Sequence, residues 1–400
     1  MTQHDSVAQR GSVEAGAEQV VVLGAGPAGL GIARELKHRH GVDPLIVDRS
    51  DAPAASWRAR YDGFRLNTCG FWSHLPGQRI PLSFGRWPTR DQMVEYFDDY
   101  VRRQGLRLRL GVRAERIDRD GAGWSITTDD ADVRASAVVV ALGNHNTPGL
   151  PPWPGMDGFT GQLLHAADYR SAEPFGGQEV LVVGSGNSAV DIALQLSSAV
   201  AAKVWMSVRT PPQLVPRSTA GLPIDTLGPL LATLPVWLLD GAAAAMRRVW
   251  FGELAGVGLP PPRQGIYTAL RALAKVPTIA DELVPRVKDS RIEIVSAVES
   301  FETNRVVLAD GTALAPQVVI GATGYRRGLD ALVGHLGVLT DDGHPVTNGP
   351  PAAAPGLWFA GYEEPLIGPL RAFRRQAPDV AAEVVSHLAA SSAASQTLSR

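Results

Sequence analysis

Two glycine-rich segments of the same construction carry the clearest chemical signal in this chain, because each is suited to hold a pyrophosphate. One of them follows the apolar run Val180–Val183 and reads Gly184-Ser-Gly-Asn-Ser-Ala189. A strand, a tight glycine turn and a helix start, in this order, aim backbone N–H groups and the positive end of a helix dipole at an anion. The first glycine makes the turn, the second lets the backbone approach the phosphates, and the small third residue packs the helix against the strand.

The earlier segment follows a similar apolar run and reads Gly24-Ala-Gly-Pro-Ala-Gly29. Its proline, Pro27, fits the first helical turn, where an N–H would be unpaired in any case. Asp48 stands at the end of the next apolar run, and a carboxylate there can accept hydrogen bonds from the 2′-hydroxyl of an FAD or NAD ribose. At the corresponding place after the second loop stands Arg209, whose guanidinium suits the 2′-phosphate of NADP. The sequence therefore predicts one adenine-dinucleotide site of each kind.

The bulk composition limits the kinds of protein that this could be. The chain has 400 residues, enough for two or three domains, and its 45% hydrophobic and 20% charged residues are typical of a globular protein. A net charge of −2 gives no electrostatic reason to expect nucleic acid. The single cysteine, Cys69, excludes an intramolecular disulfide and the dithiol–disulfide reductases, and we expect a packed thiol. No cluster of His and Cys ligands indicates a metal site.

The ends of the chain and one internal stretch have unusual compositions. Residues 1–18 are polar without the apolar core of a secretory signal, and residues 389–400 are rich in Ala and Ser, so we expect two disordered tails and a cytoplasmic protein. Leu227–Leu239 is apolar but too short and too rich in proline to span a bilayer. A lid, a dimer face, a membrane-surface contact and a core-filling helix all remain open for this stretch.

The same order of elements follows each glycine loop, which indicates two similarly built units. After the first loop, Thr89–Gln104 is typical of a helix with Thr89 as its N-cap. The runs expected to be strands are Leu106–Leu110, Trp124–Thr127 and Ala137–Ala141 in the first unit, and Arg291–Val295, Arg305–Leu308 and Gln317–Ile320 in the second. Each last strand ends in a glycine, Gly143 or Gly324.

We therefore predict an α/β fold of two Rossmann-like dinucleotide-binding domains, the NADPH domain being inserted into the FAD domain. The FAD domain would comprise residues 19–150 and 331–388, and the NADPH domain residues 151–330 with an extra helical stretch at 211–285. Leu357–Ala360 would be a last strand of the FAD domain, followed by a turn at Gly361. The backbone after this turn, from Gly368 to Phe373, would lie under the flavin.

A family resemblance rests on the segment between the two units. Phe159-x-Gly-x3-His165-x3-Tyr169-Arg170 resembles the fingerprint of flavin-containing monooxygenases at every specified position, whereas Baeyer–Villiger monooxygenases have Trp followed by Pro or Asp at the last two. Other short motifs are similar to the YUCCA-like branch of that family of class B flavoprotein monooxygenases. They are Ala55-Ser-Trp57, Tyr61-Asp62, the loop Gly184–Ala189 with Asn187-Ser188, and Ala322-Thr-Gly-Tyr325.

The resemblance implies a defined chemistry. NADPH would reduce FAD, dioxygen would add at flavin C4a, and the hydroperoxide would oxygenate nitrogen or sulfur on a small organic molecule. The alternatives are a YUCCA-like oxidative decarboxylation of an aryl-pyruvate, an uncoupled NADPH oxidase or dehydrogenase, and a flavin-bound sensor. Asn67 matches the family's asparagine beside the flavin, which plant YUCCA proteins lack, so the chain combines two patterns. A homodimer remains an open alternative.

The candidate site residues follow from these motifs. The candidates for a catalytic role are Asn67 and His165, and for His165 a role at the contact between domains, or a purely structural one, remains open. The aromatic-rich segment from Asp51 to Phe84 is either a surface loop or the loop beside the flavin. The residues expected at FAD are Gly24, Gly26, Pro27, Ala28, Gly29, Asp48, Arg49, Trp57, Gly143 and Gly361. Those expected at NADPH are Gly184, Ser185, Gly186, Asn187, Ser188, Arg209, Ala322, Thr323 and Gly324.

Overall fold

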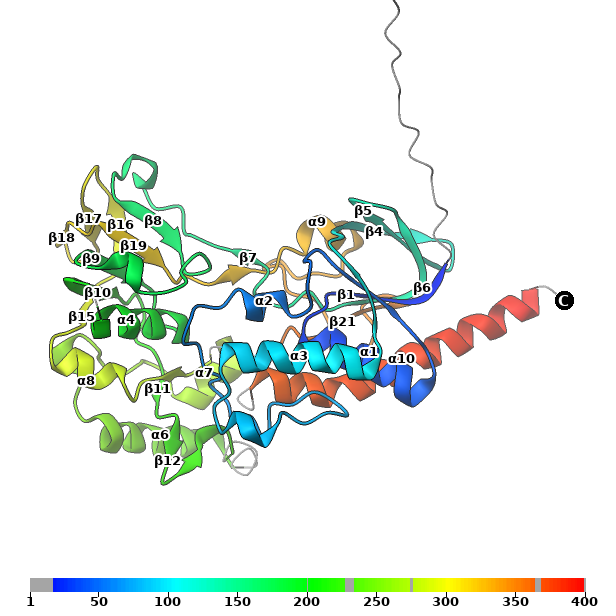
Figure 1. Cartoon of the computed structure of the whole chain (residues 1–400), viewed down its shortest axis with the longest axis horizontal. Helices are drawn as coiled ribbons and strands as arrows, with labels where there is room; N and C mark the ends of the chain where they lie inside the picture. The colour runs from blue at the N-terminus through cyan, green and yellow to red at the C-terminus, as the bar shows by residue number, and fades with distance from the viewer. Residues whose placement is uncertain (1–16, 200, 227–233, 274–275, 364–367, 399–400) are drawn as a thin grey trace, which may run out of the picture.

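The computed structural model describes residues 17–199, 201–226, 234–273, 276–363 and 368–398. Two separate sheets with helices packed against them lie side by side along the long axis of the molecule (Figure 1). We call the part built on the first sheet the first lobe (residues 17–146 and 327–398) and the part built on the second sheet the second lobe (residues 149–324). The predicted α/β fold with two Rossmann-like units is confirmed.

The first lobe contains a seven-stranded sheet in the order β3-β2-β1-β6-β5-β4, with β21 also paired to β6. Its strands are β1 (Glu18–Leu23), β2 (Leu45–Asp48), β3 (Arg107–Leu110), β4 (Ala114–Asp120), β5 (Gly123–Thr128), β6 (Val133–Val140) and β21 (Leu357–Phe359). Strands β3, β2, β1, β6 and β21 are parallel, and β4 and β5 form an antiparallel meander. The strand order reverses direction between β1 and β6, which is where open α/β sheets bind ligands.

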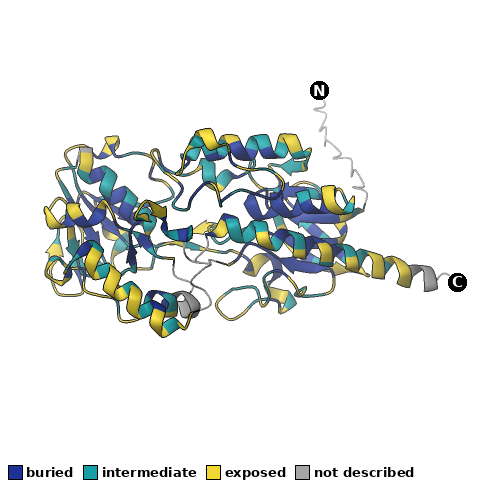
Figure 2. Ribbon diagram, turned by 90° about the horizontal axis from the view of Figure 1, so that it is seen from below, coloured by how far each residue is buried: buried dark blue, intermediate teal, exposed yellow. Residues whose placement is uncertain are grey.

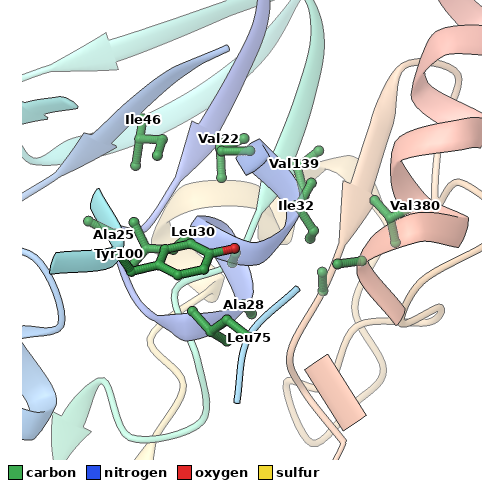
Figure 3. Close-up of a cluster of buried hydrophobic side chains, with 14 of the residues drawn as sticks. Val22, Ala25, Ala28, Leu30, Ile32, Ile46, Leu75, Tyr100, Val139 and Val380 are labelled. Atoms are coloured by element: carbon green, nitrogen blue, oxygen red, sulfur yellow. The ribbon is translucent and has the colours of Figure 1, made fainter. Parts of the chain in front are cut away.

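Helices pack on both faces of this sheet. They are α1 (Pro27–His40), α2 (Ala55–Arg58), α3 (Arg90–Gln104), α9 (Asp330–Val333) and α10 (Pro369–Leu398). Side chains from β1, β2, β6, α1 and α10 meet in one apolar cluster (Figure 3). The predicted cap of α3 is confirmed as a capping box, because the Thr89 side chain accepts from the backbone N–H of Gln92 and the Gln92 side chain accepts from that of Thr89.

The expected disorder from residue 389 is wrong for residues 389–398, because α10 continues to Leu398. Alanine has the highest helix propensity of all residues, so an Ala- and Ser-rich segment can extend a helix that is already nucleated. The end of α10 projects beyond the sheet and is largely exposed (Figure 2). The other expected tail falls mainly on residues 1–16, which lie outside the described residues, while Glu18 already belongs to β1.

The second lobe contains a five-stranded parallel sheet in the order β15-β10-β9-β19-β8. Its strands are β8 (Gln162–His165), β9 (Glu179–Val183), β10 (Lys203–Ser207), β15 (Glu293–Val295) and β19 (Val318–Gly321), and its helices include α4 (Asn187–Ala199) and α8 (Leu283–Lys288). A small antiparallel sheet of β16 (Val298–Phe301), β17 (Val306–Leu308) and β18 (Ala313–Leu314) lies beside it. The sequence did not indicate β4, β16 or β18. These three are edge strands that are either short or rich in polar residues.

The two connections between the lobes pair with each other. Strand β7 (Thr147–Pro148), which leaves the first lobe, is antiparallel to β20 (Tyr325–Arg326), which returns to it (Figure 1). Leu329 and Leu332 are then buried in the core of the first lobe. The chain therefore crosses between the lobes at this two-stranded ribbon.

The stretch expected to be a helical excursion is a mixture of helices and short strands. It contains α6 (Val236–Phe251), α7 (Ile266–Leu273), β11 (Leu214–Val215), β12 (Ser218–Thr219), β13 (Leu222–Pro223) and β14 (Thr278–Ile279). Strand β11 pairs with β14, and β12 with β13. Residues 227–233 of the apolar stretch lie outside the described residues. Short 3-10 helices occupy Leu82–Phe84, Met156–Gly158, Glu173–Phe175, Ala255–Val257 and Gly334–Leu336.

Candidate active site

The first glycine loop leaves an open space at its centre. Gly24 has φ of 109°, and a Cβ there would lie 2.4 Å from the carbonyl oxygen of Ala141. A Cβ on Gly29 would lie 2.0 Å from the Gly24 carbonyl oxygen, so this position needs a glycine to pack α1 against β1. At Gly26, by contrast, a Cβ would meet nothing within 4 Å. The loop is thus closely packed on both sides and open at the place where a phosphate would approach.

Asp48 and Arg49 stand at the carboxyl end of β2, as the sequence predicts. The Asp48 carboxylate accepts hydrogen bonds from the backbone N–H of Ala25, at 2.7 Å, and from that of Ser50, at 2.9 Å. These bonds hold the carboxylate against the glycine loop and use only part of its acceptor capacity. Arg49 donates to the carbonyl oxygen of Asn146 at 2.8 Å. Both side chains line the cavity described below.

The second glycine loop repeats this arrangement. Gly184 has φ of 139°, and a Cβ there would lie 2.5 Å from the carbonyl oxygen of Ala322, whereas a Cβ on Gly186 would meet nothing within 4 Å. Arg209 follows β10, is exposed, and lines the same cavity. Among the described residues its guanidinium has no hydrogen-bond or ion-pair partner. A free cation beside an open glycine loop fits the predicted 2′-phosphate contact.

We expected Asn187 to hold the pyrophosphate, but its side chain is hydrogen-bonded to the protein itself. Its Nδ2 donates to the carbonyl oxygen of Pro277 at 3.1 Å, and its Oδ1 accepts from the backbone N–H of Ile279 at 2.9 Å. The hydroxyl of Thr278 also donates to the carbonyl oxygen of Ser185 at 2.9 Å. The side chain therefore fastens β14 to the glycine loop, and only the backbone N–H of Asn187 remains for a phosphate.

Asn67 lies on a loop that the stretch after Pro211 holds in place. Arg217 donates to Asn67 Oδ1 at 3.3 Å and to the carbonyl oxygen of Leu66 at 3.5 Å. Asp225 accepts from the backbone N–H of Cys69 at 2.9 Å, and the Cys69 thiol is buried, as expected. No sequence motif marked Arg217 or Asp225, because they belong to the region in which the two units differ.

Both ring nitrogens of His165 are hydrogen-bonded to backbone groups. Its Nδ1 accepts from the backbone N–H of Ala167 at 3.0 Å, so Nε2 must carry the hydrogen, which it donates to the carbonyl oxygen of Gly324 at 2.9 Å. Burial lowers the pKa of this imidazole, which keeps it neutral. With both nitrogens engaged by backbone, His165 fixes the segment that leads back into the first lobe. This geometry fits the contact between domains and leaves no ring nitrogen for proton transfer.

The rest of the fingerprint holds the two lobes together. Tyr169 donates to Gln195 Oε1 at 2.9 Å, and Gln195 in turn donates to the carbonyl oxygen of Asp62 at 2.8 Å. Arg170 donates to the carbonyl oxygen of Ala59. The fingerprint therefore ties α4 of the second lobe to the segment that carries Tyr61.

Tyr61 makes a buried polar contact across the same junction. Its hydroxyl donates to Asp191 Oδ2 of α4 at 2.6 Å. Burial raises the pKa of Asp191, and this hydrogen bond counteracts that increase. Burial and the neighbouring carboxylate also raise the pKa of Tyr61, so its hydroxyl stays protonated.

The remaining predicted positions lie where the closing strands end, except for Trp57, which belongs to α2. A Cβ on Gly361, which has φ of 84°, would lie 2.7 Å from the Cβ of Ala28, so this turn packs directly on the first loop. Thr323 donates to the carbonyl oxygen of Gly149 at 2.5 Å. Trp57 packs edge-on against Phe64, with 6.0 Å between ring centroids. Gly143 and Ala322 complete the set of positions at these strand ends.

One cavity of about 2670 Å³ brings these residues together. Every predicted site residue lines it except Gly29, whose role is packing. The volume exceeds the ~300–1000 Å³ of an ordinary small-molecule pocket, as two dinucleotides and a substrate would require. Within the part of the chain that the structure describes, no group of three His, Cys, Asp or Glu side chains is arranged to bind a metal. None of the described helices is both long and apolar enough to cross a membrane.

Comparisons with known proteins agree with this geometry. A protein-family profile described as "Pyridine nucleotide-disulphide oxidoreductase" matches residues 21–222. The chain is 33% identical over 326 residues to indole-3-pyruvate monooxygenase YUCCA1 of Oryza sativa subsp. japonica, covering 80% of this chain and 79% of that protein. It is 30% identical over 358 residues to the probable indole-3-pyruvate monooxygenase YUCCA3 of Arabidopsis thaliana, covering 86% of this chain and 81% of the relative.

A solved structure has the same fold over nearly the whole length. The flavin-containing monooxygenase from Stenotrophomonas maltophilia superimposes with a TM-score of 0.67 at 25% identity, covering 92% of this chain and 98% of that one. The chain therefore belongs to the pyridine-nucleotide oxidoreductases, and within them to the YUCCA-like flavin monooxygenases.

Proposed function

We propose that the first lobe binds FAD and the second lobe binds NADPH, and that the enzyme oxygenates a nitrogen or sulfur atom of a small organic molecule. The observation that carries this proposal is that both open glycine loops, at Gly26 and Gly186, face one cavity with the Asn67 loop. Bound FAD supplies the activation of dioxygen, and NADPH supplies the hydride. The division of the chain into an FAD domain and an NADPH domain belongs to the same proposal.

The residues have separate tasks in this proposal. The backbone N–H groups of the two glycine loops bind the pyrophosphates, Asp48 binds the FAD ribose, and Arg209 binds the 2′-phosphate of NADPH. Asn67 turns its amide N–H group toward the reacting atoms, because its carbonyl oxygen already accepts from Arg217. His165, Tyr169 and the paired connections hold the lobes around the site so that water is kept away.

A second candidate is the oxidative decarboxylation of an aryl-pyruvate. The relatives that match most of the chain are named indole-3-pyruvate monooxygenases, and this observation favours it. The Asn67 loop argues for the first candidate, because the resemblance that includes this asparagine is to the enzymes that oxygenate nitrogen and sulfur. The cytoplasmic location and the homodimer remain predictions from the sequence.

Rapid mixing tests the proposal. The holoenzyme would be reduced anaerobically with NADPH and mixed with oxygenated buffer while the flavin absorbance is followed. We expect a transient flavin spectrum, distinct from the reduced and oxidised forms, that persists while NADP is bound. Direct return of the oxidised spectrum, with or without added amines, sulfides and 2-oxo acids, would contradict the monooxygenase function and favour the oxidase. No reduction by NADPH at all would favour the sensor.

A further inference from the structure

One side of α4 is fastened to a segment of the other lobe. Ser188, Asp191 and Gln195 are spaced three and four residues apart, so they form one stripe along this helix. Asp191 accepts from the Tyr61 hydroxyl at 2.6 Å, and the side chain of Ser188 interacts with the same hydroxyl. Gln195 donates to the carbonyl oxygen of Asp62 at 2.8 Å. The whole stripe therefore faces residues of the first lobe.

Tyr61 belongs to the first lobe by its place in the chain but packs into the core of the second. It is 3% exposed and is part of the apolar cluster that contains Val180 and Val190. The ring of Tyr169 lies against it, with 6.1 Å between the ring centroids. Because a close-packed core resists rearrangement, the inserted ring and its bonded hydroxyl hold the Tyr61 segment and α4 in a fixed relation.

The contact joins two elements that line the cavity. At one end, α4 begins directly after Gly186, where the backbone is open to a phosphate. At the other end, Tyr61 is followed along the chain by Phe64 and Asn67, and all three line the cavity. The hydrogen bond from Tyr61 to Asp191 thus connects the helix that receives the nucleotide to the loop beside the proposed flavin site.

We propose that Tyr61 is a positioning residue for the reduction of the flavin, because its hydrogen bond to Asp191 sets the place of the nicotinamide relative to the flavin. In this step a hydride leaves the nicotinamide of NADPH, which becomes NADP⁺, and is taken up by the flavin. A displacement of about 1 Å from the reactive geometry can lower a rate by about a hundredfold. The inference rests on the proposed assignment of FAD to the first lobe and NADPH to the second, and not on which atom is oxygenated.

Tyr61→Phe tests the role, because it keeps the ring in the core and removes the hydroxyl. We expect the limiting rate of anaerobic flavin reduction by NADPH to fall at least about tenfold, since a hydrogen bond to a charged group typically contributes this factor. The dissociation constant of NADP, measured by calorimetry on the FAD-loaded protein, should stay within about twofold, because the glycine loop and Arg209 are unchanged. The long-wavelength absorbance of NADP stacked on the reduced flavin should weaken.

A second variant separates positioning from stability. In Tyr61→Phe the Asp191 carboxylate loses its donor, and an unpaired carboxylate lowers stability by itself. The double variant Tyr61→Phe/Asp191→Asn removes this charge, so its free energy of unfolding in urea should exceed that of Tyr61→Phe, while the rate of reduction should stay low. Asp191→Asn alone keeps a side-chain oxygen for the Tyr61 hydroxyl and should retain most of the wild-type rate.

Tyr100→Phe is the matched control. The Tyr100 hydroxyl is also buried and donates to the carbonyl oxygen of Pro76 at 2.8 Å. This tyrosine lies in the core of the first lobe and is not among the described residues that line the cavity. Its variant should lose stability but reduce its flavin at the wild-type rate.

Two results would overturn the positioning role alone. One is a wild-type rate of reduction in Tyr61→Phe. The other is recovery of the rate in the double variant, which would mean that the unpaired charge, and not the missing hydrogen bond, slowed the reaction. If NADPH did not reduce the flavin of the wild type at all, the proposed function would fail and the positioning role with it.

Discussion

Arg217 donates a hydrogen bond to Oδ1 of Asn67 at 3.3 Å, across 150 residues of sequence. A guanidinium has only donors, so the atom of Asn67 that faces it must be the carbonyl oxygen. The amide Nδ2 is then the group left to donate into the cavity. Arg217 thus determines which end of Asn67 a bound flavin or its oxygen adduct would meet.

Replacement of Arg217 should therefore affect the site without removing Asn67. In Arg217→Lys the charge remains but the planar fork that spans Asn67 and Leu66 is lost, and in Arg217→Gln the charge is lost as well. We expect the transient flavin spectrum after mixing with oxygen to decay at least roughly tenfold faster in both, because a hydrogen bond to a charged group contributes about 1.5–3 kcal/mol and about 1.4 kcal/mol corresponds to a factor of ten. Rapid mixing with NADP present is the measurement.

Arg263→Lys is the control for Arg217→Lys, because Arg263 lines the cavity and no contact fixes its guanidinium among the described residues. Its transient should decay as in the wild type. An Arg217→Lys variant with a normal transient but weakened FAD retention would show that Arg217 only stabilises the loop.

The sequence predicted those parts of the site that depend on local geometry. A glycine loop is recognisable because the turn at Gly24 or Gly184 leaves no room for a Cβ, whatever the rest of the chain does. The partners of Asn67 and Asn187 were not predictable, because they come from loops and a short strand between Pro211 and Pro285 with no periodic pattern. The tail after residue 389 was misjudged because its composition fits both a disordered segment and the end of a long helix.

Arg209 gives a prediction on cofactor selectivity. Its guanidinium lines the cavity and has no partner among the residues that the structure describes, so Arg209→Ala removes a cation without leaving a described buried group unpaired. We expect KM for NADPH to rise by about tenfold to a hundredfold, the range for a charge-assisted phosphate contact, while KM for NADH stays nearly constant. Steady-state oxidation of the two nucleotides is the measurement. An equal rise for both would contradict the 2′-phosphate assignment.

Asn187 gives a prediction on stability, because its side chain serves the protein and not the nucleotide. Asn187→Ala leaves the Pro277 carbonyl and the Ile279 N–H without partners, at a cost of roughly 1–3 kcal/mol each if they stay dry. We therefore expect a lower free energy of unfolding in urea, together with weaker NADP binding, because β14 is released from the glycine loop. Asn187→Asp keeps the acceptor for Ile279 and should lose less.

Ser197→Ala on the same helix is the control for Asn187. Its hydroxyl only donates to the carbonyl oxygen of Leu194, and such a change within a helix alters stability by less than about 0.5 kcal/mol. If Asn187→Ala weakened NADP binding while its urea midpoint matched that of Ser197→Ala, the side chain would have to contact the nucleotide itself.

His165 gives a prediction on pH dependence. Burial lowers its pKa in the folded protein below the ordinary value near 6.5, so the unfolded chain binds the proton more readily. The wild type should therefore lose stability as the pH falls from about 6.5 toward the folded pKa, and this contribution should vanish above about pH 7. His165→Asn removes the titrating group, so its midpoint of thermal unfolding should fall less between pH 7.5 and 5.5 than that of the wild type, even if it starts lower.

His38→Gln, at an exposed histidine of α1, is the control for His165→Asn, and its midpoint should follow that of the wild type. If the pH profile of His165→Asn ran parallel to that of the wild type, the pKa of His165 would be the same in the folded protein and in the unfolded chain. His165 could then not be held neutral by the hydrogen bonds to Ala167 and Gly324.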